Sequence, residues 1–203
     1  MRILAIETAT EACSVALFED GALLAGEHRI LGRGHAEQLV PMIKALPDRG
    51  RATRILVSLG PGSFTGVRIG IATARALGIA WNAEVLGYPT LALVAATNGQ
   101  TQANPVTVCM TGGHGEWLVQ DFSADGLPQT DFASLRPDAA ILRGAHKVIA
   151  GTKASELAAS LSTGTVGSTV IPDARNVLAL PTEVITSEIA PIYGRPPDAR
   201  LPS

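Results

Sequence analysis

Residues 54–80, RILVSLGPGSFTGVRIGIATARALGIA, join an apolar run to an alanine-rich run through a loop with three glycines. RILVSL predicts a buried strand, and the alanine-rich run predicts a helix over about 66–80. A glycine loop between a strand and a helix directs N–H groups outward and can bind an anion. Here the spacing is G-x-G-x-x-x-G, one residue longer than the dinucleotide-binding motif, and no Gly-Lys-Ser/Thr follows. The pattern argues against a phosphate site and leaves Gly62 and Ser63 as the loop's only candidates for cofactor binding.

Two faces of the predicted helix 66–80 carry small residues. One stripe recurs at every fourth position and consists of Gly66, Gly70, Ala74 and Gly78. Glycine inside a helix costs up to about 1 kcal/mol relative to alanine, so the stripe indicates close packing, either on the protein's own sheet or on a partner. A different face carries two arginines seven positions apart together with two alanines: Arg68, Ala72, Arg75 and Ala76. This face is either an ordinary solvated surface or a platform for a partner's helix, whose carboxylates the arginines reach.

The elements around this stretch predict an α/β fold. Strands are expected at 2–6, 13–20 and 22–30, with an Asp20-Gly21 hairpin turn between the last two. An amphipathic helix follows over 35–46, and a strand and a helix (84–87 and 89–97) come after the central stretch. The order strand, strand, strand, helix, strand, helix, strand, helix is typical of a mixed sheet flanked by helices.

The second half predicts a shortened copy of the first. We expect an N-terminal lobe over 1–97, a polar linker over 98–104 and a smaller C-terminal lobe over 105–203. Strands are expected at VTVCM, EWLVQDF and KVIAG, with a helix over 153–161. The tail from 190 contains four prolines and should run as an extended surface segment.

Composition narrows the classes of function. The chain has 203 residues, 46% of them apolar, which is ample for a core, and its net charge is −2. Aromatic residues make up only 4%, so autonomous nucleic-acid binding is not expected. Cys13 and Cys109 fit no metal or disulfide pattern and are expected to be buried free thiols. No apolar window is long enough to span a membrane, and a cytoplasmic location is expected.

The sequence lacks the metal-binding and nucleophile motifs that would indicate catalysis at the helix 35–46 and at the glycine loop. His35 opens the helix 35–46, but Leu39 takes the i+4 position that a second metal ligand would need. Ser63 does not lie in a G-x-S-x-G elbow. Glu7, at the end of the first strand, is the one carboxylate placed where sheet-based sites gather ligands, and it is a further cofactor-binding candidate.

Four segments resemble the bacterial TsaB (YeaZ) family: MRILAIETATEACSVALFEDG, GHAEQLVPMI, GPGSFTGVRIGIATARALG and PIYGRPPDA. The resemblance implies a duplicated ribonuclease-H-like fold of the actin, Hsp70 and sugar kinase superfamily, with a reduced second lobe. It further implies a non-catalytic subunit of the machinery that makes threonylcarbamoyladenosine in tRNA. Such a subunit binds and stabilises the catalytic relative TsaD, and the ATPase TsaE joins the assembly.

The same resemblance implies a helical bundle, formed by helices 35–46 and 66–80 with their counterparts in TsaD or in a second copy. The candidate interface residues on these helices are His35, Gln38, Met42, Arg68, Ile71, Ala72, Arg75 and Ala76. No metal or cofactor of its own is expected; ATP and metal belong on the partner subunits, and tRNA is reached only through the complex. The segment 109–122 departs from the family pattern, which puts contacts through the second lobe in doubt.

Two other functions stay open at this point. The fold and the glycine loop also suit a nucleotide-dependent transferase or kinase acting alone. A metallopeptidase, suggested by older naming of the wider family, would require bound metal.

Overall fold

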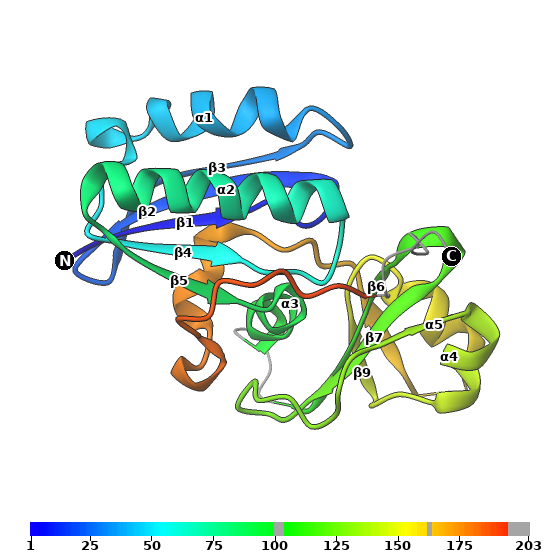
Figure 1. Ribbon diagram of the computed structural model, residues 1–203. Helices are drawn as coiled ribbons and strands as arrows, with labels where there is room; N and C mark the ends of the chain where they lie inside the picture. Colours follow the sequence, from blue (N-terminus) through cyan, green and yellow to red (C-terminus); the bar gives the residue numbers. More distant parts are fainter. Residues whose placement is uncertain (100–103, 162–163, 195–203) are drawn as a thin grey trace.

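The computed structural model describes residues 1–99, 104–161 and 164–194. Its first half contains a five-stranded mixed sheet in the order β3-β2-β1-β4-β5 (Figure 1). The first three strands pair antiparallel, whereas β1, β4 and β5 run parallel. These strands are β1 (Arg2–Glu7), β2 (Ala12–Glu19), β3 (Ala22–Ile30), β4 (Arg54–Ser58) and β5 (Glu84–Tyr88).

The turn between β2 and β3 lies at the predicted Asp-Gly pair. Asp20 has a φ of 48° and Gly21 a φ of 84°, both in the left-handed region that a tight two-residue hairpin requires. The predicted antiparallel meander is confirmed.

Helices cover both faces of this sheet (Figure 1). α1 (His35–Ala45) and α2 (Phe64–Trp81) lie on one face, and α3 (Thr90–Gly99) lies on the other. Side chains alternate along β1, so that Leu4 and Ile6 pack with α1 and α2 while Ile3 and Ala5 pack with α3. The two faces of β1 therefore contribute to two different cores.

The second sheet repeats the topology of the first. Its order is β8-β7-β6-β9-β10, with an antiparallel meander of β6, β7 and β8 and with β9 and β10 parallel to β6. This repetition confirms the duplicated fold, and the copy is reduced because three of its strands have only three residues. The strands are β6 (Val106–Thr111), β7 (Trp117–Phe122), β8 (Ala133–Leu135), β9 (Val148–Ala150) and β10 (Val166–Ser168).

Short helices complete the second half. The sequence did not predict α4, β8 or β10, because prolines, aspartates and glycines interrupt the periodicity there. The helices are α4 (Pro137–Arg143), α5 (Ala154–Ser160) and the short 3₁₀ helices η1 (Pro47–Gly50), η2 (Gly113–Gly115), η3 (Ala174–Ala179) and η4 (Thr182–Val184). Within the described ranges, no helix has both the length and the apolar character needed to cross a bilayer.

A shared core joins the two halves. Leu91, Leu93 and Val94 of α3 are fully buried, and their cluster includes Ala5 of β1 and Val108 of β6. α3 therefore lies between the two sheets (Figure 1). The expected free thiols Cys13 and Cys109 are both buried and unpaired.

The chain returns to the first sheet after β10. The Ala174 N–H donates to Ser14 Oγ at 2.9 Å, and Thr186 exchanges two backbone hydrogen bonds with Gly87 of β5. The expected C-terminal lobe of 105–203 therefore needs correction, because its later part packs on the first sheet through contacts that sequence order does not reveal. The predicted linker 98–104 starts inside α3; its residues 100–103, and residues 195–203 of the tail, lie outside the described ranges.

Candidate functional site

The small-residue stripe of α2 faces the protein's own sheet. Gly66, Gly70, Ala74 and Gly78 are all buried. A methyl group added at Gly66 would overlap the carbonyl oxygen of Thr8, and one at Gly78 would overlap the side chain of Val85. Of the two alternatives that the sequence left open for this stripe, the structure shows packing on the protein's own sheet, where the glycines allow α2 to approach β1 and β5.

The opposite side of α2 is open to solvent. Phe64, Arg68, Ala72 and Ala76 follow one another at steps of four residues, and all four are exposed. Residues spaced in this way form one ridge along a helix. We call these four residues the α2 ridge. Ile79 continues the apolar character at the end of the helix, with 86% of its surface exposed.

α1 lies beside α2 on the same face of the sheet and extends this surface (Figure 1). Val40 is 56% exposed, and Gln38 is half-buried and accepts a hydrogen bond from Arg29. Of the predicted interface residues, Gln38, Arg68, Ala72, Arg75 and Ala76 reach the surface. Their contact with a partner stays a prediction.

Three of the predicted interface residues are buried inside the chain. Met42 and Ile71 belong to the core between the helices and the sheet, with 1% and 4% of their surfaces exposed. His35 is also buried, and its Nε2 lies 3.2 Å from the carbonyl oxygen of Ala12. A partner lying on the surface does not touch these side chains, because they occupy the apolar faces with which α1 and α2 pack on the sheet.

Both arginines of α2 contact the C-terminal segment of the same chain. Arg75 Nη2 donates to the carbonyl oxygen of Ile189 at 2.6 Å, and Arg68 Nε donates to Tyr193 Oη at 3.0 Å. Sequence reasoning missed these contacts because the partners are 114 and 125 positions apart. The arginines hold this segment beside α2.

The glycine loop makes a tight connection, as its sequence predicts. Gly60 has a φ of 91°, and Ser63 caps α2 by accepting a hydrogen bond from Gly66 N at 3.2 Å. The Ser63 N–H donates to the carbonyl oxygen of Ala9 at 2.6 Å, which ties the loop to the β1–β2 turn. The backbone thus turns from β4 into α2 against that loop.

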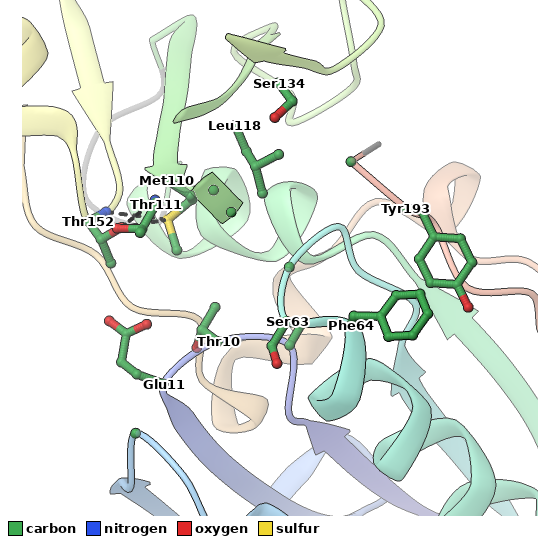
Figure 2. A pocket seen from close by; sticks show the side chains of 16 residues that line it. Thr10, Glu11, Ser63, Phe64, Met110, Thr111, Leu118, Ser134, Thr152 and Tyr193 are labelled. Atoms are coloured by element: carbon green, nitrogen blue, oxygen red, sulfur yellow. Dashed lines mark hydrogen bonds between the residues drawn. The ribbon is translucent and has the colours of Figure 1, made fainter. Parts of the chain in front are cut away.

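A cleft of about 720 Å³ opens between the ends of the two sheets. Gly62 and Ser63 line it, together with hydroxyl groups from several elements (Figure 2). Among the described lining residues the only charged side chain is Glu11, and none is a lysine, arginine or histidine. The hydroxyl-bearing residues are Thr10, Ser63, Thr111, Ser134, Thr152 and Tyr193. Such a lining offers hydrogen bonds but no positive charge to neutralise a phosphate.

Glu7 lies at the end of β1 but does not line the cleft. Its Oε1 accepts a hydrogen bond from Ala9 N at 2.7 Å, while its Oε2 makes none in the described part of the chain. Complete burial raises the pKa of the Glu7 carboxyl to about 7. A cofactor bound in the cleft would therefore not contact Glu7 directly, because Glu7 is not among the residues that line the cleft.

Among the residues that the structure describes, titratable side chains do not cluster in the manner of a metal site. In residues 1–99, 104–161 and 164–194, no group of three His, Cys, Asp or Glu side chains could hold an ion. Leu39, which holds the position four residues after His35 where a second metal ligand would be needed, is fully buried in the core.

The fold and the surface define a class: a duplicated α/β protein with two mixed sheets, a cleft between their ends and an exposed pair of helices. The family model described as "TsaD: tRNA N6-adenosine threonylcarbamoyltransferase" matches residues 29–131, half of the chain. The chain belongs to this family.

Within the family, the chain is similar to proteins called TsaB. It is 44% identical over 100 residues to the tRNA threonylcarbamoyladenosine biosynthesis protein TsaB of Escherichia coli, covering 47% of this chain and 43% of that protein. To the protein of the same name in Bacillus subtilis it is 34% identical over 90 residues, covering 42% and 38%. The alignments thus span less than half the length of these curated relatives.

Two solved structures match nearly the whole chain. A Pseudomonas aeruginosa protein described as similar to peptidase YeaZ has a TM-score of 0.80 and 27% identity, covering 96% of this chain and 99% of its own. YeaZ from Pseudomonas aeruginosa has a TM-score of 0.77 and 28% identity, covering 95% and 99%. These matches confirm the resemblance to the TsaB (YeaZ) family.

Proposed function

We propose that this chain is a non-catalytic scaffold subunit of the complex that installs threonylcarbamoyl on adenosine of tRNA. In this role it binds and stabilises the catalytic relative TsaD through the exposed face of α1 and α2. The observation that carries the proposal is the α2 ridge, where two exposed alanines stand between charged and apolar side chains. The names of the relatives supply the pathway.

The shape of the ridge suits a helix as its partner. Ala72 and Ala76 leave little side chain between the backbone of α2 and an approaching helix, as interfaces of small residues do. Exposed apolar surface at Val40 and Ile79 would be removed from water on docking, which favours association. The sequence of α2 contains two arginines and no acidic residue, so an acidic partner surface is favoured.

The cleft supports a non-catalytic role for this chain. Its described lining offers one carboxylate, Glu11, and neither a histidine nor a lysine that could act as a base or neutralise a phosphate. In the proposed assembly ATP and metal are held by the partner subunits, TsaE joins the complex, and tRNA is reached through it. We expect a homodimer when the chain is alone, and the cytoplasm as its location.

A new charge on the ridge tests the docking surface. Replacing Ala72 or Ala76 with glutamate places a long charged side chain at the point of closest approach, and affinity for the catalytic relative should fall at least tenfold. The measurement is biolayer interferometry with the co-expressed catalytic subunit of the same organism.

Ala139→Glu is the matched control, because Ala139 is also exposed on a helix, α4, and lies in the second half of the chain. It should leave the affinity within twofold of wild type. Unchanged binding by both ridge variants, with circular dichroism showing an intact fold, would contradict the proposal.

The alternative is a nucleotide-dependent transferase or kinase acting alone, and the 720 Å³ cleft is the observation that favours it. Calorimetry with ATP and Mg²⁺ on the purified chain separates the two functions. Saturable binding at millimolar nucleotide would support the transferase or kinase function. No binding at that concentration would rule this function out.

A further inference from the structure

Three side chains from two segments far apart in the sequence form one stack at the start of α2. The guanidinium carbon of Arg68 lies 3.5 Å from the centroid of the Phe64 ring and 5.5 Å from that of Tyr193. The two ring centroids are 5.0 Å apart with an angle of 31° between the planes. Because Arg68 also donates to Tyr193 Oη, the three groups fix one another's orientation. We call them the aromatic anchor.

The backbone that carries Tyr193 is itself fixed. The Ile192 N–H donates to the carbonyl oxygen of Leu59 at 2.7 Å, and Arg75 holds Ile189 as described above. Ile189 and Ile192 pack against the core beneath α2. Gly60 is required here, since a side chain at that position would crowd the carbonyl oxygen of Ile192. The segment that ends at Tyr193 is therefore part of the surface around α2.

The anchor is organised but not buried. Phe64 remains 48% exposed, and Arg68 is exposed as well. Phe64 and Tyr193 border the cleft side by side (Figure 2). Aromatic and arginine side chains that are already ordered lose little entropy when a partner covers them, which is why such groups dominate binding energy at interfaces.

The anchor is continuous with the docking surface proposed above. Phe64 and Arg68 are the first two residues of the α2 ridge, and Ala72 and Ala76 are the next two. A helix laid along the alanines therefore meets the anchor at the end of the ridge that borders the cleft. α2 itself contributes only positive charge to this face, because Arg68 and Arg75 are its only charged residues.

We infer that Phe64, Arg68 and Tyr193 form the main binding anchor of this face, so that the C-terminal segment is a component of the interface with the catalytic relative. The group that it accepts is an acidic side chain on the partner protein, whose carboxylate pairs with Arg68 beside the two rings. This inference rests on the proposed function. An RNA base stacked on the rings is the competing occupant, and it is disfavoured by the acidic net charge of −2 and by Glu11 in the adjoining cleft.

The test uses the full chain and replaces one ring at a time. Phe64→Leu and Tyr193→Leu each keep an apolar side chain but remove the surface on which Arg68 stacks. We expect each to weaken binding of the co-expressed catalytic relative at least tenfold. Leu24→Ala is the control, because Leu24 is a comparably exposed apolar residue, 42%, on β3. It should stay within twofold of wild type.

The Tyr193 variant is the decisive one, because it leaves α2 itself unchanged. If Ala72→Glu abolishes binding while both ring variants bind like wild type, the anchor is overturned and the docking surface stands. If the wild-type chain does not bind the catalytic relative, the proposed function and the anchor both fail. If the ring variants lose binding of a tRNA transcript to the isolated chain but keep the protein partner, the anchor is an RNA site and the inference is wrong.

Discussion

One buried carboxyl group illustrates how a single residue can set the response of this chain to pH. Glu7 is fully buried, one of its oxygens has no hydrogen-bond partner in the described part of the chain, and burial raises its pKa from 4.5 to about 7. The folded state therefore keeps the proton at a pH where the unfolded chain has already lost it.

The sign of the effect on stability follows from these two pKa values. Below pH 4.5 both states carry the proton and Glu7 costs nothing; as pH rises to 7 the unfolded state ionises first, and the free energy of unfolding falls. The full difference corresponds to about 3 kcal/mol. Glu7→Gln keeps an oxygen that can accept from Ala9 N but does not titrate, so its stability should change less over this interval.

Urea unfolding of wild type and Glu7→Gln at pH 4.5, 6 and 7.5 measures this difference directly. Between pH 4.5 and 7.5 the free energy of unfolding should fall more for wild type than for Glu7→Gln. The variant therefore becomes more stable relative to wild type as the pH rises. Parallel pH profiles would show that Glu7 titrates normally.

At the scale of the element, α2 has a glycine face that packs on the sheet and a ridge that faces solvent. Its pattern left open which face packs on the sheet, because both faces carry small residues and hydrophobic periodicity alone does not show which one is buried. The sheet decides, since only the side with Gly66, Gly70 and Gly78 can approach β1 and β5 without overlap.

Gly66→Ala tests the close contact between α2 and β1. The added methyl group would overlap the Thr8 carbonyl oxygen, and the backbone can shift only by disturbing the core. We expect a loss of about 2 kcal/mol or more in the free energy of unfolding, although alanine favours a helix over glycine by about 1 kcal/mol.

Gly113→Ala is the matched control for this substitution. No heavy atom would lie within 4 Å of its new methyl group, so its stability should change by less than about 0.5 kcal/mol. Urea denaturation of the two variants gives both values, and equal stabilities would contradict the close packing of α2.

At the scale of the whole molecule, the two halves share one core. α3 is buried between the sheets, and the segment with η3 crosses back to hydrogen-bond with Ser14 of β2. Removing α3 or the segment with η3 would expose apolar surface of the first half to water. Each Å² exposed lowers the free energy of unfolding by about 25 cal/mol.

Truncation tests this dependence. A chain of residues 1–99 would expose Leu91, Leu93 and Val94, and should show no cooperative thermal transition. A chain of residues 1–170 keeps the second sheet but loses η3, and should melt below the full chain. Calorimetry of the three proteins measures the transitions; cooperative melting of 1–99 within about 5 °C of the full chain would show that the first half is independent.

The sequence by itself determined the first half of the fold, because strand alternation, the Asp20-Gly21 turn and the glycine loop are local signals. It also determined the family, through the match of its motifs. Only the tertiary structure decided which face of α2 is exposed, where the cleft lies and that Arg68 and Arg75 hold residues 189–193. These features depend on contacts between residues that are distant in the sequence, up to 125 positions for Arg68 and Tyr193, or on packing between elements, and such contacts leave no periodic signal in the chain. The buried positions of His35, Met42 and Ile71 follow from the same cause, since packing on the sheet takes the apolar faces that a partner would otherwise use.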